Sequence, residues 1–352
     1  MRIIVAVDSF KGCLSSLEAN KAVADAMKKK FPQAEIVEIA VSDGGEGWLE
    51  AIHRSLGGRM VDVEAHDPLM RPIVAPVLID GSKAYIESAK VIGLGLLADE
   101  ERNPLVASSY GLGELVAGAV RHGASDIIVG LGGSGTSDAG IGMLKALENS
   151  MEKLTPSQRN EIPENIRFTI ATDVRSPLYG HNGAACLFAR QKGADDEMVK
   201  HLERRDRLFA RIVGRKMGYD CSNLPGAGAA GGLGYAFIQF LDARCVSGAE
   251  YILDAIGFDN FLNDASIVIT GEGRADRQTV LGKLPYVILK KAQQKSVSVY
   301  LIAGRIEDYE LLLKAGFSKI IEVTPRSMPL ELAMNPKTAK MLIEKYGLAD
   351  SL

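Results

Sequence analysis

The 352-residue sequence has only four cysteines and five histidines. Cys13, Cys186, Cys221 and Cys245 show no C-x-x-C spacing, which argues against a disulfide framework or a zinc site and predicts free, mostly buried thiols. No run reaches about 18 uninterrupted apolar residues, and the start of the chain lacks a basic segment followed by a long apolar one. We therefore expect a cytoplasmic protein that does not bind membranes.

The chain also lacks an excess of charge of either sign. Its formal net charge is −3, and 47% of its residues are hydrophobic, so no polyanion-binding surface is indicated. We expect small-molecule partners and no nucleic acid, whereas the sequence leaves the oligomeric state open. The length exceeds that of one ordinary domain and fits two, each able to bury a core of its own.

Both ends of the chain alternate strands and helices. The strand Arg2–Val7 precedes a helix in which Ser15 and Glu18 have capping-box spacing, and a second strand is expected over 35–41. The last ninety residues show the same alternation of strands and helices. Strands are expected over 267–270, 298–303 and 319–323, and helices are expected after Pro285 and before Gly316. Such alternation implies parallel strands with helices on both faces.

The middle of the chain has a different pattern. Residues 59–66 alternate apolar and polar side chains, and the strands expected over 73–79 and 83–87 flank Asp80-Gly81, a hairpin signal. We infer an α/β protein of two domains. Residues 1–60 and 261–352 would form a discontinuous, doubly wound parallel domain, and residues 61–260 an inserted α/β domain with a mixed sheet.

Charged residues and glycines follow the first two expected strands. Asp8, Ser9 and Lys11 follow the first, and Asp43 and Glu46 follow the second, with Gly44, Gly45 and Gly47 between and beside them. The ends of parallel strands are where open α/β sheets bind ligands. Glycine lets backbone N–H groups approach an anion, and carboxylates can hold a metal ion or a substrate hydroxyl. The pattern predicts a site that handles phosphate.

A glycine-rich segment joins the strand expected over 126–129 to a helix expected over 141–147. Free N–H groups and the helix dipole would make this segment an anion cradle, with Gly132, Gly133, Ser134, Gly135, Thr136 and Asp138 as its candidate residues. Gly130, Gly132 and Gly135 also match G-x-G-x-x-G, but the next expected strand ends at Asp173, too late for a dinucleotide fingerprint. Phosphate binding is favoured, with dinucleotide binding and a merely tight turn as alternatives.

Two further glycine clusters lie at expected element ends. The cluster over 225–234 has no charge, and close helix packing and ligand contact are equally compatible with it. The cluster over 270–276 is expected to be a loop that carries Glu272 and Asp276, with Lys283 at the start of the next helix. These three side chains would face a ligand, with solvated loop charges as the alternative.

The sequence resembles the bacterial glycerate kinase family from residue 1 to about 285. The resemblance is carried, in the family's order, by the segments at 8–12, 43–47, 132–138, 173–178, 191–194, 225–234 and 270–283. It implies ATP-dependent phosphorylation of D-glycerate with Mg²⁺, usually yielding 2-phosphoglycerate, and a flavodoxin-like domain interrupted by a second α/β domain. The candidate residues are divided between the two expected domains, with Lys11 and Asp43 in one and Asp173 and the anion cradle in the other, so we expect the active site in the interdomain cleft.

For such a reaction, Lys11 is the candidate charge that meets the glycerate carboxylate or the moving phosphoryl group. Asp43 and Asp173 compete for the roles of general base and Mg²⁺ ligand, and we favour Asp173 near the metal and Asp43 near the substrate hydroxyl. Substrate contacts are expected from Asp8, Ser9, Glu46, Glu272, Asp276 and Lys283. The anion cradle would bind ATP.

Two other function classes stay open at this point. A nicotinamide-dependent hydroxy-acid oxidoreductase would use the Gly130 loop, and a non-catalytic relative would sense the ligand without turning it over. Trp48 is the only tryptophan and lies where the family usually has a small hydroxyl residue. It could narrow the substrate pocket or be a core aromatic.

Overall fold

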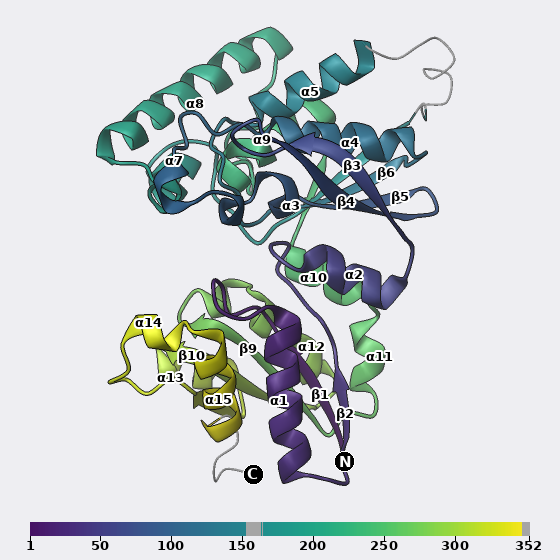
Figure 1. Ribbon diagram of the computed structural model, residues 1–352, viewed down its shortest axis with the longest axis vertical. Helices are drawn as coiled ribbons and strands as arrows, with labels where there is room; N and C mark the ends of the chain where they lie inside the picture. Colours follow the sequence, from purple (N-terminus) through teal and green to yellow (C-terminus); the bar gives the residue numbers. More distant parts are fainter. Residues whose placement is uncertain (153–162, 164, 347–352) are drawn as a thin grey trace. The chain divides into compact units, whose positions relative to one another are not determined.

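The computed structural model describes residues 1–152, 163 and 165–346. It divides into two compact units (Figure 1), and the last six residues of the expected discontinuous domain lie outside the described part. Unit 1 comprises Met1–Asp43, Glu50–Leu56 and Ala249–Leu352, and unit 2 comprises Gly44–Leu49 and Gly57–Gly248. Compared with the expected boundaries, the segment Gly44–Leu49 belongs to unit 2 and the return to unit 1 comes at residue 249.

Unit 1 is built on five parallel strands: β1 (Arg2–Val7), β2 (Glu35–Glu38), β9 (Ile267–Ala275), β10 (Ser298–Ile306) and β11 (Lys319–Glu322). Their order is β11-β10-β9-β1-β2, and every pair is parallel. Counted along unit 1 alone this is the order 2-1-3-4-5, which is the flavodoxin-like arrangement. The expected doubly wound sheet of both chain ends is confirmed.

Helices cover both faces of this sheet. The helix α1 (Ser16–Lys30) connects β1 to β2 at one edge of the sheet. The helices α12 (Leu284–Gln294) and α13 (Tyr309–Ala315) connect successive strands toward the other edge. Because crossovers between parallel strands are right-handed, α1 lies on one face of the sheet and α12 and α13 lie on the other. In Figure 1, α15 (Pro336–Tyr346) lies beside α1, and both share one core with the strands. The remaining helices of this unit are α11 (Phe258–Leu262), α14 (Leu330–Ala333) and most of α2 (Trp48–Leu56) and α10 (Gly248–Ala255).

Local sequence signals explain where these elements begin and end. Ser15 accepts a hydrogen bond from the Glu18 N–H while the Glu18 carboxylate accepts from the Ser15 N–H, so the expected capping box is present. The second strand ends at Glu38, three residues earlier than expected. β9 instead continues five residues past the expected end, because Arg274 and Ala275 pair with Arg305 and Ile306 of β10. The predicted loop over 270–276 is therefore largely strand.

Unit 2 contains a six-stranded mixed sheet of β3 (Arg59–His66), β4 (Pro72–Asp80), β5 (Lys83–Glu87), β6 (Asp126–Gly130), β7 (Arg167–Ala171) and β8 (Arg244–Val246). The first three strands pair antiparallel, and β5 to β8 pair parallel. The hairpin turns at Asp80-Gly81, where Gly81 has a φ of 58° that favours glycine. The expected mixed sheet and hairpin are confirmed, whereas β8 was not predicted.

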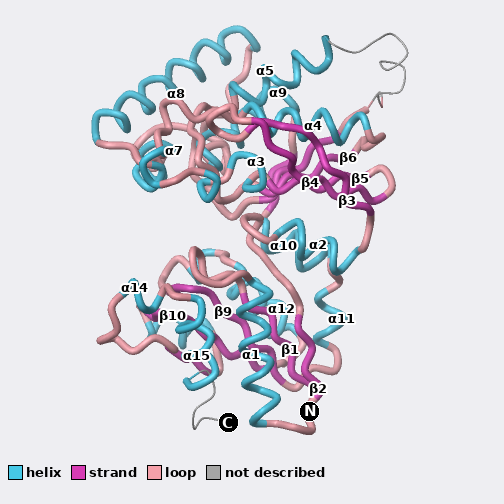
Figure 2. The backbone as a smooth tube through the Cα atoms, in the orientation of Figure 1, coloured by secondary structure: helices cyan, strands magenta, loops and turns pink. Residues whose placement is uncertain are grey.

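Among its described residues, unit 2 has the helices α3 (Ala89–Ile92), α4 (Tyr110–Arg121), α5 (Ile141–Glu152), α7 (Ala184–Phe188), α8 (Asp196–Met217) and α9 (Ala229–Leu241). Residues of α4, α5 and α9 join the strands in one large apolar core. Figure 2 shows the backbone of these helices and strands. Such a core forms because consecutive parallel strands are joined by crossovers of one hand, which brings these helices to one face. Each unit thus has a core of its own, as two domains require.

Several smaller expectations are decided by burial. Trp48 is 0% exposed and its ring packs near Tyr85, so it is a core aromatic. All four cysteines are free, but each is partly exposed and not buried. Among the described residues, no helix is both long and apolar enough to cross a membrane.

Candidate active site

The charged residues predicted at the first strand end meet at one point of the unit 1 sheet. β1 and β9 are neighbours with Val7 beside Gly271, and the Asp8 N–H donates to the Gly271 carbonyl at 2.9 Å. The chain order of the strands reverses at β1, so the carboxyl ends of β1 and β9 form the topological switch point of this sheet. Ligands bind at this position in open α/β sheets.

Lys11 and Asp43 form an ion pair beside this point. The Lys11 ammonium donates to Asp43 Oδ2 at 2.9 Å, and the Lys11 side chain is 74% exposed. The neighbouring Asp43 carboxylate, and then Asp8, raise the pKa of Lys11 although desolvation acts against them. The raised pKa means that Lys11 stays positively charged. Because the side chain is exposed, solvent screens the ion pair, and the pair does not contribute a large stabilisation to the fold.

Asp8 lies deeper than this ion pair. Its side chain is buried, and the pKa of its carboxyl is raised well above the usual range by desolvation and by the nearby Asp43, with Lys11 acting in the opposite direction. Asp8 Oδ1 accepts the Ser9 N–H at 2.7 Å, which fixes its orientation. Two carboxylates and one lysine therefore share the switch point, and the negative charge of Asp8 would be favoured by any further cation.

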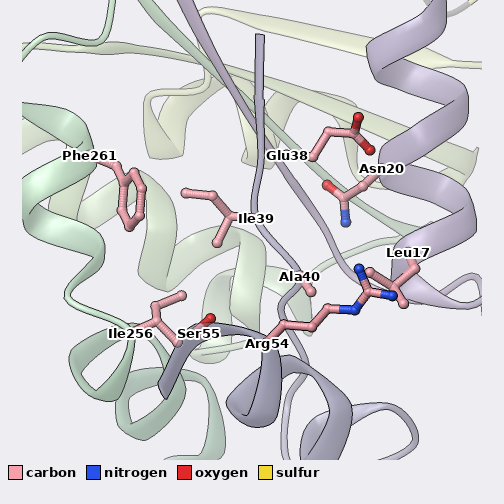
Figure 3. Close-up of a pocket in the computed structure, with 9 residues that line it drawn as sticks. All are labelled: Leu17, Asn20, Glu38, Ile39, Ala40, Arg54, Ser55, Ile256 and Phe261. Atoms are coloured by element: carbon pink, nitrogen blue, oxygen red, sulfur yellow. The ribbon is translucent and has the colours of Figure 1, made fainter. Parts of the chain in front are cut away.

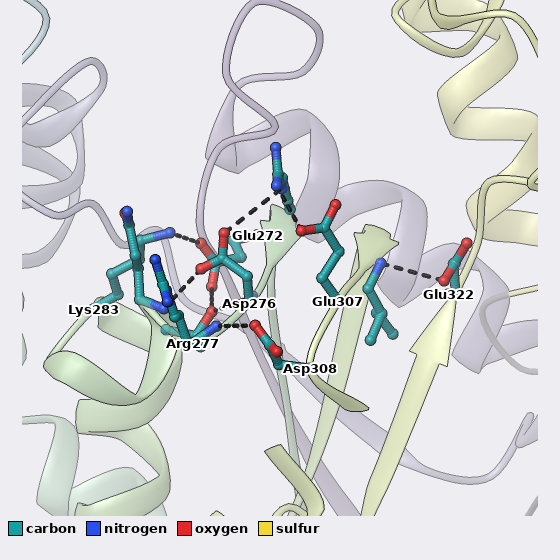
Figure 4. A network of polar contacts seen from close by, with 11 residues as sticks. Glu272, Asp276, Arg277, Lys283, Glu307, Asp308 and Glu322 are labelled. Atoms are coloured by element: carbon teal, nitrogen blue, oxygen red, sulfur yellow. Dashed lines mark hydrogen bonds and ion pairs between the residues drawn. The ribbon is translucent and has the colours of Figure 1, made fainter. Parts of the chain in front are cut away.

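Glu272, Asp276 and Lys283 form a neighbouring polar network (Figure 4). Buried Glu272 accepts hydrogen bonds from the Thr279 hydroxyl at 2.6 Å and from the Lys283 ammonium at 2.9 Å. Burial raises the pKa of Glu272, and Lys283 opposes this. Asp276 accepts from the Gln278 N–H at 2.7 Å and so closes the turn before α12. These residues hold the end of β9 to the following helix, and their role as ligand contacts stays a prediction.

The approach of the Lys11 loop to β9 depends on a glycine. A Cβ atom at Gly273 would lie 3.3 Å from Phe10 Cα and 3.6 Å from the Lys11 nitrogen. The first of these distances is too short for an ordinary contact, so any larger residue would push the loop that carries Lys11 away from the strand. Gly273 therefore serves close packing at the switch point.

The anion cradle lies in unit 2, after β6, and the structure corrects one argument for it. The N–H groups of Gly140 and Gly142 at the start of α5 donate to the Asp138 carboxylate, each at 3.0 Å, and Ser109 donates to the same carboxylate through its N–H and its hydroxyl. The helix end is thus already capped. An anion would have to bind to the loop before it, over Gly132–Ser134, and Asp138 itself is a structural cap.

Three consecutive N–H groups of this loop are open. The Leu131 N–H bonds to Ala171 and the Gly135 N–H to Ile92, but Gly132, Gly133 and Ser134 have no backbone N–H partner within the described residues. Gly133 has a φ of 66°, and successive N–H groups around such a residue form an anion-binding concavity. Gly132–Ser134 is therefore the part of the cradle that fits a phosphate.

Gly135 and the backbone of Thr136 are closely packed by their neighbours. A Cβ at Gly135 would lie 3.1 Å from the Leu97 side chain, and a Cβ at Gly231 would lie 2.1 Å from the Thr136 carbonyl oxygen. The Ala139 N–H donates to the Gly231 carbonyl at 3.0 Å. The uncharged cluster over 225–234 thus packs closely beneath the cradle, which decides between the two alternatives for its glycines.

The G-x-G-x-x-G match has the same explanation. A Cβ at Gly130 would lie 3.0 Å from the Trp48 ring, and one at Gly132 would lie 2.5 Å from Gly45 Cα. Because glycine has no Cβ, Gly130 and Gly132 allow the loop of residues 44–48 to pack closely against the end of β6. This packing explains the two glycines without a bound dinucleotide. The same loop holds the exposed Glu46.

Glu87 is the last residue of β5, and its carboxylate holds the loop of residues 44–48 in place. It is 0% exposed and accepts the N–H groups of Gly47 and Leu49 at 3.2 and 3.0 Å. Burial raises its pKa, and Lys90 and the two N–H groups oppose this. Glu87 therefore fixes the segment that follows Asp43.

Asp173 follows β7, and its Oδ1 accepts a hydrogen bond from the Ser247 hydroxyl at 2.7 Å. Within residues 1–152, 163 and 165–346, no three His, Cys, Asp or Glu side chains are grouped to hold a metal ion. Mg²⁺ in phosphoryl transfer needs only one or two carboxylates, since phosphate oxygens and water complete its shell. An oriented carboxylate such as Asp173 fits that requirement.

A functional candidate that received no role from the sequence is Lys192. It is 2% exposed and donates to Ser134 Oγ at 2.9 Å and to the Thr136 carbonyl at 2.6 Å, so it lies against the cradle. Its segment was noted only as part of the resemblance, because a lysine in a Gln-Lys-Gly-Ala run gives no sign of which loop it will reach. Burial alone identifies it.

Unit 1 also contains a cavity of about 610 Å³ away from these residues (Figure 3). It lies beyond the end of β2 and is lined by Leu17, Asn20, Glu38, Ile39, Ala40, Arg54, Ser55, Ile256 and Phe261. No residue predicted for the active site lines it. Asn20 is used structurally there, because its amide oxygen and nitrogen bond the N–H and carbonyl of Val7.

Comparisons with known proteins identify the family to which the chain is similar. The model of the "Glycerate kinase family" matches residues 3–348. A glycerate kinase of Bacillus subtilis is 38% identical over 100% of this chain and 99% of its own, and a glycerate 2-kinase of Escherichia coli K12 is 37% identical over 88% and 86%. A crystal structure from Salmonella typhimurium LT2 assigned to glycerate kinase 2 has a TM-score of 0.72, with 32% identity over 98% and 97% of the two chains. The resemblance in the motifs is thus confirmed, and the chain belongs to the glycerate kinase family.

Proposed function

We propose that the protein transfers the γ-phosphoryl group of ATP to the 2-hydroxyl of D-glycerate, giving 2-phosphoglycerate and ADP. The observation that carries this proposal is the cluster of Asp8, Lys11 and Asp43 at the switch point of the unit 1 sheet. It offers a cation for an anionic substrate beside carboxylates that can accept a proton. Membership of the family and the named relatives support the same reaction.

In this mechanism the 2-hydroxyl oxygen forms a bond to the γ-phosphorus while the bond from that phosphorus to the bridging oxygen of ADP breaks. The hydroxyl proton passes to the Asp43 carboxylate, and the Lys11 ammonium stabilises charge on the transferring oxygens. The open N–H groups of Gly132–Ser134 bind phosphate oxygens of ATP. A Mg²⁺ ion held by Asp173 would neutralise phosphate charge.

We further propose that the reaction draws on both units. Lys11 and Asp43 belong to unit 1, whereas Asp173 and the Gly132–Ser134 loop belong to unit 2. The predicted interdomain active site would then be completed when both substrates bind, which would also exclude water. Small-angle scattering with glycerate and a non-hydrolysable ATP analogue should show a smaller radius of gyration. An unchanged radius with rapid ATP hydrolysis in the absence of glycerate contradicts this part.

The decisive experiment is to incubate the protein with ATP, Mg²⁺ and, in separate reactions, D-glycerate, L-glycerate and other small hydroxy acids. We expect ADP formation with D-glycerate and a 2-phosphoglycerate signal in phosphorus NMR. A 3-phosphoglycerate signal would correct the position only. ATP consumption with another hydroxy acid and none with D-glycerate would refute the substrate.

The oxidoreductase alternative is tested in the same preparation. Melting temperatures are compared with ATP-Mg²⁺ and with NAD, because a ligand that binds the folded state raises its stability. We expect stabilisation by ATP-Mg²⁺ alone. A rise with NAD alone would favour the alternative, and a rise with glycerate and ATP without any turnover would favour the sensor. Cytoplasmic location stays a prediction.

A further inference from the structure

Lys192 is a buried cation that the mechanism above does not use. It lies in a short 3-10 turn, Arg190–Lys192, and its side chain runs beneath the cradle to Ser134 and Thr136. Lysine is almost never fully buried unless it is paired, because removing an ammonium from water is costly. The position therefore requires an explanation beyond the packing of its aliphatic stem.

The charge of Lys192 is not matched by a carboxylate. Within the described residues it forms no ion pair, and both of its hydrogen bonds go to uncharged oxygens. The two carboxylates that act on the charge of Lys192 have other partners: Asp138 caps α5, and Asp206 accepts a hydrogen bond from Arg205 at 2.9 Å. An ammonium has three N–H donors, and two are accounted for here.

A second polar group beside the cradle also lacks a partner. The Thr136 hydroxyl is on a residue that is 0% exposed, and its oxygen has no hydrogen-bond partner among the described residues. A buried hydroxyl left in this state is unfavourable, and in a native protein it calls for an explanation such as a bound water or ion, or a role in catalysis. Thr136 follows the open N–H groups of Gly132–Ser134 by two residues in the chain.

The bond from Lys192 determines what Ser134 can do. Because Ser134 Oγ accepts from the ammonium, its own O–H proton must point elsewhere and is free to donate to another oxygen. A donor that is itself hydrogen-bonded to a cation is strengthened, since such chains polarise one another. Ser134 thereby presents a charge-assisted donor from the same loop whose N–H groups are open.

We propose that Lys192 is a positioning residue for the phosphates of ATP, which aims the Ser134 hydroxyl and the Gly132–Ser134 N–H groups at a phosphoryl oxygen and contributes positive charge beneath it. The inference rests on the proposed function, because it takes ATP as the phosphoryl donor. It adds the part of the site that supplies cationic charge in unit 2. Lys11 supplies the corresponding charge in unit 1.

The surroundings of Lys192 give the proposal a pH signature. Burial lowers the pKa of Lys192 to about 8, and the carboxylates of Asp138 and Asp206 oppose this shift. The Arg205 guanidinium, on α8 beside Asp206, is a further charged group near the cradle, because it donates to the Ser137 carbonyl. A lysine with a lowered pKa keeps its proton below that pKa and loses it above. ATP binding should therefore weaken as the pH rises through about 8.

The test compares Lys192→Met, Lys192→Arg and the control Lys200→Met. Methionine keeps a long stem without charge, and arginine keeps the charge. Lys200 is an exposed lysine of the same unit that is paired with Glu197 at 2.7 Å. We expect Lys192→Met to raise KM for ATP about tenfold or more, as expected for the loss of a charged contact, with KM for glycerate within twofold. Lys192→Arg should recover part of the loss, and Lys200→Met should match the wild type.

The pH profile separates positioning from mere structure. For the wild type, kcat/KM for ATP should fall above about pH 8, and for Lys192→Met it should be flat over the same range. Unchanged KM for ATP and an unchanged profile in Lys192→Met would overturn the inference, as would a loss confined to KM for glycerate.

Two further measurements keep the inference testable in every case. If Lys192→Met does not fold, Ser134→Ala removes only the hydroxyl that Lys192 contacts and should raise KM for ATP in the same direction; no change would refute the proposal. If the wild type phosphorylates no hydroxy acid, the proposed function fails. Calorimetric binding of ATP-Mg²⁺ to wild type and Lys192→Met still decides this inference, which equal affinities would overturn.

Discussion

Replacement of Lys11 by alanine tests the proposed site most directly, because stability and turnover should respond very differently. The Lys11 ammonium contacts Asp43 at 2.9 Å, but its side chain is 74% exposed. Exposed ion pairs of this kind contribute about 0.2 to 1 kcal/mol to the free energy of unfolding. The variant should thus lose less than about 1 kcal/mol of stability.

The kinetic effect should be much larger. If Lys11 meets the transferring phosphoryl group, its loss removes an interaction that is strongest in the transition state. Single donors of that kind contribute about a hundredfold or more in kcat, or about 2.7 kcal/mol in the activation barrier. The increase in the activation barrier should therefore exceed the loss in the free energy of unfolding severalfold. The loss of an ordinary surface lysine cannot produce this difference.

The assay measures ADP release with D-glycerate by a coupled reaction, and the free energy of unfolding by urea titration. The matched control is Lys21→Ala, which removes a lysine that is 64% exposed and paired with Asp25 at 2.8 Å on α1 of the same unit. Both variants should lose similar stability, but only Lys11→Ala should lose turnover. Near-normal kcat in Lys11→Ala, or an equal loss in Lys21→Ala, would refute the reasoning.

Two other predictions address the loop after Asp43 and the buried acid on α8. A Cβ at Gly44 would lie 2.7 Å from the Ala171 carbonyl oxygen, whereas Gly47 has open space, and both have positive φ. Each change to alanine should cost about 1 to 2 kcal/mol of backbone strain, but Gly44→Ala should lose more stability and also turnover; equal losses by urea titration and ADP release would contradict this. Burial raises the pKa of the Asp206 carboxyl to about 7, although Arg205 opposes this shift. The folded protein therefore binds the proton of Asp206 more tightly than the unfolded chain does. As a result, the folded protein should lose stability as the pH rises from about 4 to 7. The loss is at most about 4 kcal/mol. Asp206→Asn should show a shallower fall in stability between pH 5 and pH 8, and parallel curves for both proteins would disprove it.

Much of the fold follows from local sequence patterns. The alternation at both chain ends, the capping box of Ser15 and the Asp80-Gly81 turn each depend on a few neighbouring residues, and all three were predicted correctly. The extension of β9 through Arg274 and Ala275 could not be predicted, because its pairing partners lie about thirty residues away in β10. Glycines there indicate a loop by local preference, and the sheet overrides that preference.

The candidate site divides in the same way. Because parallel strands end at one edge of a sheet, the sequence alone brings Asp8, Lys11 and Asp43 to a common place, as the ion pair of Lys11 and Asp43 shows. Only the tertiary structure shows that Asp138 is already occupied as a helix cap and that Lys192 reaches Ser134 from 58 residues away. Burial and contacts between distant segments decide which polar groups still need a partner, and neither is encoded in any short run of residues.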